Sequence, residues 1–290
     1  DLENIAKRVP FSTGAELENI MNEAAILAAR GRLKAINQQT LVEAISRVQM
    51  GPEKRSHKVT QRDKRMVAIH EAGHAIVGHV LPNCDEVHLI TIVPRGQAGG
   101  YTLSLPTEED DLQTYSQLMD FVAMGLGGHA AEQLYLGEFT TGATSDLKKA
   151  TEVCRRMVTQ FGMSDKIGLM SLATSHNEYL DGQAYVDCAQ TTAAEADAEV
   201  QKLLSACYEQ AKELLAENRE LLDEISLYLL QKETITGDEL MKYVNARENK
   251  RLAAPEADAP EGGNDAAQAE SADRAAADKT AEAKPEHDGT

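Results

Sequence analysis

The chain has no tryptophan, and aromatic residues make up only 4% of its 290 residues. It also lacks an uninterrupted apolar run of roughly 18 residues, so the sequence predicts no membrane-spanning helix. Acidic residues outnumber basic ones by 47 to 29, and the formal net charge is −18. This balance argues against a surface that binds nucleic acid, which needs clustered Lys and Arg, and against docking on an anionic membrane face. Because 42% of the residues are apolar, the chain can still bury a core.

Cysteine pairs are also missing. The four cysteines are scattered and form no C-x-x-C (Cys84, Cys154, Cys188 and Cys207). We therefore expect reduced thiols rather than a disulfide framework or a cysteine metal site.

The residues after Asp1 lack the basic start and apolar core of a signal peptide. Since the chain opens within a helical pattern and without an initiator Met, we expect it to be a piece of a longer protein.

The pattern along the chain predicts three regions. Residues 1–50 show short amphipathic helices, and the polar, Gly-Pro-containing stretch 51–56 marks a boundary. Residues 51–250 carry the remaining helices and strands. From 251 to 290 the composition becomes acidic and Ala-rich, with ten acidic and three basic residues after residue 252. We expect a disordered tail there, with recruitment of partners as the alternative role.

The expected architecture is mainly α with a small β-hairpin. A strong helical pattern covers residues 61–80, and two strand-like stretches follow it, joined by a turn-prone segment rich in Gly. The strands are expected at 87–93 and 100–105, and further helices at 115–136, 145–161, 191–218 and 237–246.

The strongest chemical signal is an H-E-x-x-H sequence, His70-Glu71-Ala72-Gly73-His74, inside the 61–80 helix. Histidines at positions i and i+4 lie above one another on a helix face, so both imidazoles can bind one Zn²⁺. Glu71 is then the general base that accepts a proton from water.

Gly73 and Gly78 each cost about 1 kcal/mol relative to Ala inside a helix. They indicate close approach of another backbone or ligand, or simply tolerated glycines.

A catalytic zinc site needs a third protein ligand. His79 points off the metal face, His88 lies in a strand pattern, and His129 lies among small residues typical of packing. Glu132 on a second helix and Asp146 in the first turn of another are better candidates. Asp146 could also be a first-turn Asp that only favours the helix dipole. The residues alone leave Glu132 and Asp146 equally open.

Several motifs in order resemble the peptidase domain of FtsH-like ATP-dependent zinc metalloproteases. The N-terminal stretches Phe11–Leu17 and Asn22–Ala25 resemble the helical lid that ends the AAA+ ATPase domain of that family. The peptidase motifs are His70–His74, Gly99–Thr102, Gly127–Glu132, Thr140–Leu147 and Phe161–Ser164.

The resemblance implies a zincin-like helical metallopeptidase domain at 51–250, preceded by an AAA+ lid remnant at 1–50. It implies that His70, His74 and Asp146 are the zinc ligands and that Glu71 is the catalytic base. Glu132 then becomes a supporting carboxylate.

The resemblance also implies a substrate-binding edge strand beside the zinc helix. Gly99, Gly100, Tyr101 and Thr102 would pair with an extended polypeptide through backbone hydrogen bonds. The alternative is an ordinary hairpin strand. The leucines between 191 and 244 carry no ligand pattern and are expected in the core or in a subunit contact.

Two motif positions depart from the family, which usually has Arg in place of His129 and often Asn in place of Ser145. The chain has no G-x-x-x-x-G-K-[ST] motif to hold ATP and Mg²⁺. ATP use, a homo-hexamer and an N-terminal anchor in a bacterial inner membrane, with this part on the cytoplasmic side, are therefore implied only for the longer parent. We expect this piece itself to be soluble.

Two functions compete at this point. The first is a zinc endopeptidase that cleaves unfolded or membrane-extracted polypeptides, fed by an ATPase in the parent. The second is a non-catalytic pseudo-protease scaffold that supports assembly. Stoichiometric zinc binding would favour the first.

Overall fold

The computed structural model describes residues 1–10, 12–54, 59–96, 98–106, 112–174, 185–186 and 188–253. The chain divides into two compact units, Asp1–Glu248 and Asn249–Thr290. The tail was predicted to begin at residue 251, but helix α9 (Gly237–Ala253) continues past that point. The rest of the predicted tail, residues 254–290, and Phe11 of the lid motif lie outside the described residues.

Three helices precede the H-E-x-x-H region, as predicted: α1 (Leu2–Ala6), α2 (Gly14–Arg30) and α3 (Gln38–Met50). Thr13 caps the start of α2 with a capping box: its hydroxyl accepts a hydrogen bond from the Glu16 backbone N–H, and the Glu16 carboxylate accepts one from the Thr13 backbone N–H. The two longer helices share a small apolar core of their own, made by Ile20, Ala24, Ala44 and Ile45. A domain boundary after residue 50 stays a prediction.

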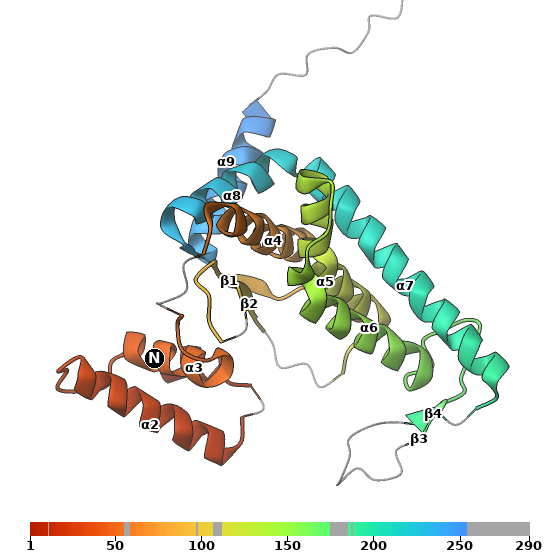
Figure 1. Cartoon of the computed structure of the whole chain (residues 1–290), viewed down its shortest axis with the longest axis horizontal. Helices are drawn as coiled ribbons and strands as arrows, with labels where there is room; N and C mark the ends of the chain where they lie inside the picture. Colours follow the sequence, from red (N-terminus) through yellow and green to blue (C-terminus); the bar gives the residue numbers. More distant parts are fainter. Residues whose placement is uncertain are drawn as a thin grey trace, which may run out of the picture. The chain divides into compact units, whose positions relative to one another are not determined.

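Two long helices, α4 (Gln61–Val80) and α5 (Tyr115–Leu136), cross at the centre of the larger core (Figure 1). At the crossing, a Cβ added to Gly73 would lie 2.6 Å from the carbonyl oxygen of Gly127. A Cβ on Gly78 would lie 2.9 Å from the Met124 sulfur. The close approach of another backbone is therefore confirmed at Gly73, whereas Gly78 meets only side chains, which leaves the alternative of a tolerated helix glycine.

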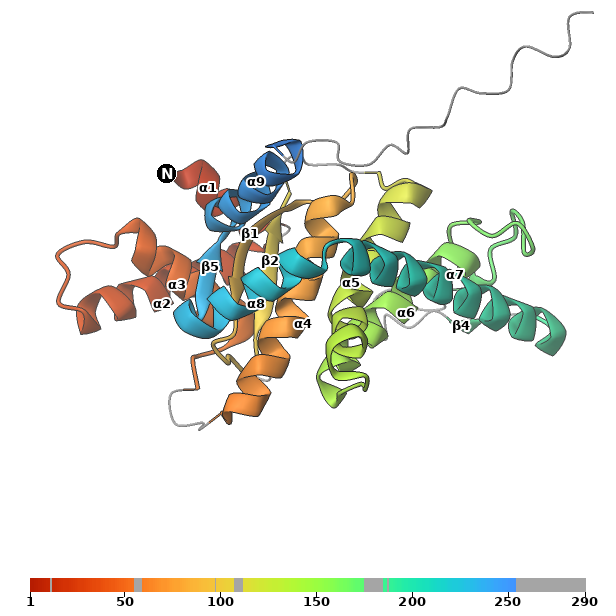
Figure 2. The same cartoon turned by 90° about the horizontal axis from the view of Figure 1, so that it is seen from above.

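An antiparallel sheet lies against α4 (Figure 2). Strand β1 (Glu86–Thr91) pairs with β2 (Tyr101–Leu105), which confirms the predicted hairpin. The sequence did not predict β5 (Thr234–Thr236), which pairs with the other side of β1. The strand order β2-β1-β5 leaves β2 at an edge of this sheet in the described structure.

The remaining helices complete the main core around α4 and α5. The chain passes through a short 3₁₀ turn, η1 (Thr141–Ala143), into α6 (Thr144–Thr159), and continues after β3 (Ala173–Thr174) and β4 (Tyr185–Val186). The sequence predicted α7 (Gln190–Glu217) but not α8 (Arg219–Lys232) as a separate helix. Leu221, Leu222 and Ile225 are buried, so these residues belong to the core.

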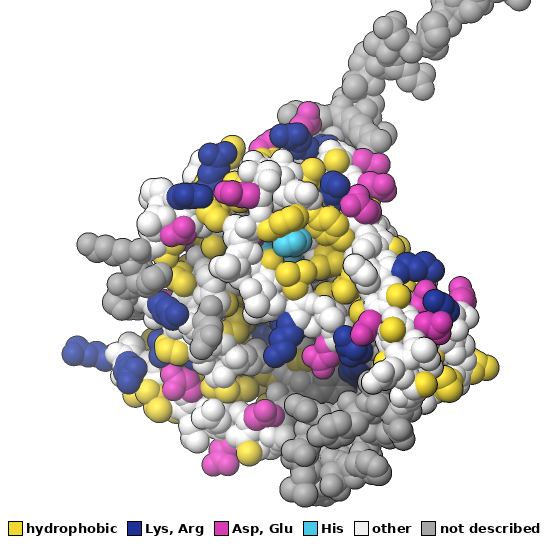
Figure 3. Space-filling model, turned by 45° about the vertical axis from the view of Figure 1, so that its right-hand side comes forward, with side chains coloured by type: hydrophobic (Ala, Val, Ile, Leu, Met, Phe, Trp, Pro, Cys, Tyr) yellow, Lys and Arg dark blue, Asp and Glu magenta, His cyan; other side chains and the backbone are white. Residues whose placement is uncertain are grey.

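No described helix is both long enough and apolar enough to cross a bilayer. On the face drawn in Figure 3, acidic and basic side chains are interspersed, and hydrophobic side chains gather around a histidine. That face therefore carries no uniformly basic patch of the kind that nucleic-acid binding requires.

Candidate metal centre

Helix α4 places His70 and His74 one turn apart on one face. Their Nε2 atoms lie 3.0 Å from each other, and the two rings meet edge to face. Both side chains are largely covered, with exposed fractions of 10% and 12%. The helix therefore presents two converging imidazole nitrogens on side chains that the surrounding protein largely covers.

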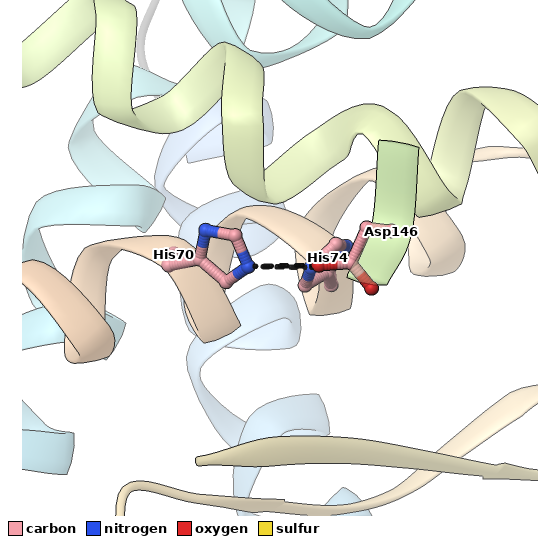
Figure 4. Close-up of side chains that lie close together, drawn as sticks. All are labelled: His70, His74 and Asp146. Carbon is pink, nitrogen blue, oxygen red and sulfur yellow. Dashed lines mark hydrogen bonds and ion pairs between the residues drawn. The ribbon is translucent and has the colours of Figure 1, made fainter. Parts of the chain in front are cut away.

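The first turn of α6 brings Asp146 to the same point (Figure 4). Its Oδ2 lies 3.3 Å from Nε2 of His70 and 3.7 Å from Nε2 of His74. Ligand atoms about 2.1 Å from a tetrahedral zinc ion are about 3.4 Å apart. One atom from each of the three residues can therefore reach a single ion, and all three lie within 4.8 Å of one another.

Both imidazoles are oriented through their other nitrogen. Nδ1 of His70 lies 2.8 Å from Oε1 of Glu132, and Nδ1 of His74 lies 2.8 Å from the carbonyl oxygen of Met124. These acceptors require a proton on Nδ1, although the Gly128 N–H also points at Nδ1 of His74 from 3.3 Å. In a neutral imidazole with the proton on Nδ1, Nε2 carries the lone pair that can bind a metal, the arrangement usual for histidine ligands.

The structure places Glu132 behind His70 rather than beside the converging Nε2 atoms. Its carboxylate accepts hydrogen bonds from the Thr140 backbone N–H at 2.8 Å and from the Thr140 hydroxyl at 2.9 Å. It is 98% covered, and these bonds together with His70 lower its pKa despite burial. Of the two candidates that the residues left open, Asp146 lies beside the converging Nε2 atoms and Glu132 lies behind His70. Metal binding by Asp146 stays a prediction.

The charges around the imidazoles favour a cation. Burial by itself lowers the pKa of His70, but hydrogen bonds to Asp146 and Glu132 and the nearby charge of Glu71 outweigh burial and raise it to about 10. Burial raises the pKa of Asp146, yet its hydrogen bonds to His70 and His74 bring the pKa below its usual range. Three carboxylates thus create a negative potential that a divalent ion bound by neutral imidazoles would balance.

Glu71 follows His70 on α4 and is directed toward the sheet. The residue is 6% exposed, and its Oε2 lies 3.0 Å from the hydroxyl of Thr102 on β2. Burial raises the pKa of Glu71, although the charges of His74 and His70 and the Thr102 hydrogen bond oppose that shift. A carboxylate whose pKa is raised above its ordinary value is a stronger base than an exposed one, which suits a group that accepts a proton from water.

A glycine keeps the space between the imidazoles and α5. A Cβ built on Gly128 would lie 2.6 Å from Nε2 of both His70 and His74. Any side chain here would collide with the two Nε2 atoms. The bare backbone at Gly128 therefore leaves the space in which both nitrogens could bind a small ion. Sequence reasoning assigned Gly128 no role, although the Gly127-Gly128 pair inside a long helix was a visible signal.

The four residues expected to bind substrate lie at the start of β2. Tyr101 and Thr102 are in the edge strand, and Gly99 and Gly100 come directly before it. A Cβ on Gly100 would lie 3.1 Å from Cγ of Glu71, so this backbone passes directly beside the glutamate. Binding of a polypeptide here stays a prediction.

The other histidines considered do not join the site. His88 contacts Arg8, in the turn after α1, and the pKa of His88 is lowered by burial and by the charge of Arg8. His129 stacks on Phe139, with ring centroids 4.2 Å apart, as expected of a packing residue. His79 is in the last turn of α4 and belongs to the lining of a separate cavity of about 650 Å³ beside β1.

Comparison with known proteins agrees with this geometry. The family described as peptidase family M41 matches residues 57–243, which include α4, α5, α6 and all three candidate ligands.

Curated relatives match over most of this chain. The ATP-dependent zinc metalloprotease FtsH 1 of Thermoanaerobacter sp. (strain X514) is 44% identical over 250 residues, which are 85% of this chain and 41% of the relative. The FtsH 3 protein of Petrotoga mobilis is 48% identical over 83% of this chain and 38% of the relative. The FtsH protein of Clostridium perfringens is 44% identical over 88% of this chain and 36% of the relative. The chain thus spans about two fifths of their length.

Proposed function

The chain belongs to peptidase family M41, with zinc metalloproteases as its relatives, and from that premise we propose that it is a zinc endopeptidase acting on unfolded polypeptides. The observation that carries the proposal is the convergence of two imidazole nitrogens and one carboxylate oxygen from α4 and α6, beside a buried glutamate. This set matches a catalytic zinc site, with three protein ligands and an open fourth position.

His70, His74 and Asp146 would hold the ion in this proposal. Zinc, when bound, supplies a Lewis acid that polarises the scissile carbonyl and acidifies water. Glu132 and the Met124 carbonyl keep each Nδ1 protonated and each imidazole oriented. Glu71 accepts the proton of the attacking water and then donates it to the leaving amine.

The substrate lies along β2 in this proposal. The edge position of β2 and the small residues Gly99 and Gly100 support it, because an extended chain can add to an exposed sheet edge by backbone hydrogen bonds. Recognition through backbone atoms accepts many sequences, which suits an enzyme that degrades unfolded proteins.

Replacing Glu71 by Gln tests the mechanism. The variant keeps the size of the side chain but cannot accept a proton, so we expect full zinc content and loss of casein cleavage by about 100-fold or more. Cleavage at the wild-type rate would overturn the mechanism. Wild-type protein without stoichiometric zinc, measured by mass spectrometry, would instead favour the pseudo-protease scaffold.

The third ligand is tested by a pair of variants. Asp146→Asn should lose zinc during dialysis, because it removes a ligand charge, whereas Glu132→Gln should weaken zinc binding by only about 10- to 100-fold through His70. If Glu132→Gln strips the metal and Asp146→Asn does not, the assignment of Asp146 is wrong.

We also propose that α1–α3 form the end of an AAA+ lid and that a longer parent couples proteolysis to ATP. The relatives are named ATP-dependent, and this chain covers only part of their length. A hexameric assembly and a membrane anchor of the parent belong to the same proposal. ATP-stimulated casein degradation by the full parent protein would support it, and degradation indifferent to ATP would contradict it.

A further inference from the structure

The hydroxyl of Thr102 contacts the glutamate next to the metal site. Its Oγ1 lies 3.0 Å from Oε2 of Glu71 and 3.1 Å from the Glu71 backbone carbonyl oxygen. In the part of the chain that the structure describes, this is the one hydrogen bond that reaches the Glu71 carboxylate. A buried carboxylate is the stronger acceptor of the two, so the Thr102 proton is directed to Oε2.

The backbone of the strand is close-packed against Glu71. Residues two apart in a strand share a face, and Gly100 and Thr102 both face α4. A Cβ on Gly100 would lie 2.8 Å from Val67 and 3.1 Å from Cγ of Glu71, which leaves the strand no room to move closer. The Thr102 hydroxyl is therefore held at hydrogen-bonding distance from the Glu71 carboxylate.

We propose that Thr102 is a positioning residue, whose hydroxyl holds one carboxylate oxygen of Glu71 so that the other faces the attacking water. The terminal torsion of a glutamate is broad, so an untethered carboxylate samples many orientations. A general base must lie within about 3 Å of the proton that it accepts. This inference rests on the proposed peptidase activity, and it gives the Thr102 side chain a role separate from backbone pairing with substrate.

The strand β2 would then have two functions. Its outer edge receives the substrate, while the Thr102 side chain on its α4 face orients the base. Displacement of the strand would therefore disturb both the substrate edge and the base at once.

Steady-state kinetics on an unstructured fluorogenic peptide test the proposal in the zinc-loaded 290-residue chain. Thr102→Val removes the hydroxyl and keeps the shape. We expect kcat to fall about 10- to 100-fold, with KM within about twofold of wild type and one zinc per chain. Thr102→Ser restores the hydroxyl and should recover most of the lost kcat. Thr191→Val, at an exposed site on α7, is the control for the same chemical change.

Four results would separate the possibilities. A normal kcat in Thr102→Val would overturn the positioning role. An increase in KM alone would also overturn it, because it would make Thr102 a substrate contact. Equal loss in the Ser and Val variants would show that the hydroxyl is not responsible. Glu71→Gln, assayed beside them, separates failure of the positioning role from failure of the peptidase proposal. If Glu71→Gln loses activity and Thr102→Val is normal, the peptidase proposal stays intact. If Glu71→Gln keeps full activity, the proposed function itself is overturned.

Discussion

Gly128 lies on α5 directly against the two imidazoles of the proposed zinc site. The absence of a side chain leaves the volume in which the Nε2 atoms of His70 and His74 converge. The candidate ligands alone therefore do not make the site. The neighbouring helix α5 must also have a residue without a side chain at position 128.

Replacing Gly128 by Ala should impair metal binding. The new Cβ would lie 2.6 Å from both Nε2 atoms, so the imidazoles must rotate away from their shared point. We expect the zinc dissociation constant, measured by competition with a chelator, to rise at least about tenfold.

Gly125→Ala on the same helix is the matched control, because its Cβ would meet nothing within 4 Å. It should bind zinc as wild type does. Equal zinc affinity in the two variants would contradict the role assigned to Gly128.

At the scale of elements, the crossing of α4 and α5 determines how the site is assembled. Glycines on both helices, Gly73 and Gly127, let the two backbones approach. Since α4 provides the imidazoles and α5 provides Glu132 and the Met124 carbonyl, this approach brings the ligands to their supports.

Gly73→Ala should destabilise the fold more than Gly78→Ala. The Cβ at position 73 meets a backbone oxygen at 2.6 Å, which forces the helices apart at a cost of about 1–3 kcal/mol. At position 78 the obstacle is the flexible Met124 side chain, and the gain in helix propensity, about 1 kcal/mol, offsets the contact. Urea unfolding gives both free energies. A larger loss at position 78 would contradict this account of the crossing.

The start of α9 carries a pH-dependent contribution to stability. Glu239 accepts hydrogen bonds from Lys232, from the Thr236 backbone N–H at 3.1 Å and from the Tyr228 hydroxyl at 3.2 Å. The ion pair with Lys232 and the Thr236 bond lower the pKa of Glu239 to about 2, from an ordinary 4.5. Because the folded-state pKa is the lower one, this stabilisation is present above pH 4.5 and is lost as the pH falls toward 2.

Glu239→Gln should therefore melt at a lower temperature than wild type at pH 7, and the difference should shrink between pH 4.5 and pH 2. The difference is small, since the pair is near the surface and solvent screens it. Glu213→Gln, an exposed charge change on α7, controls for net charge. A difference in melting temperature that is constant over this pH range would refute the assignment.

At the scale of the whole molecule, one buried cation connects the N-terminal helices to the β1–β2 connection. Arg95 is 7% exposed and pairs with Glu43 of α3 and with Glu53, each at 2.8 Å. Burial lowers the pKa of Arg95, but its hydrogen bonds to Glu43 outweigh this and raise it. Since the same connection leads into β2, the N-terminal helices contact the segment that precedes the candidate substrate strand.

Features that depend on local spacing could be predicted from the sequence. The convergence of the two H-E-x-x-H imidazoles, the helices with capping residues such as Thr13, and the β1–β2 hairpin all follow from residues close together in the chain. The strand β5 could not be predicted, because its three residues pair with a strand about 140 positions earlier. Likewise, whether Asp146 or Glu132 lies beside the imidazole Nε2 atoms depends on how α5 and α6 pack against α4, and spacing along the chain contains no such information.

Zinc K-edge X-ray absorption on the purified chain would show whether His70, His74 and Asp146 hold one zinc ion. We expect one zinc per chain, with two imidazole nitrogens and oxygen ligands at about 2.0–2.2 Å and no sulfur. A sulfur ligand at about 2.3 Å, a single imidazole, or a folded chain without stoichiometric zinc would contradict it.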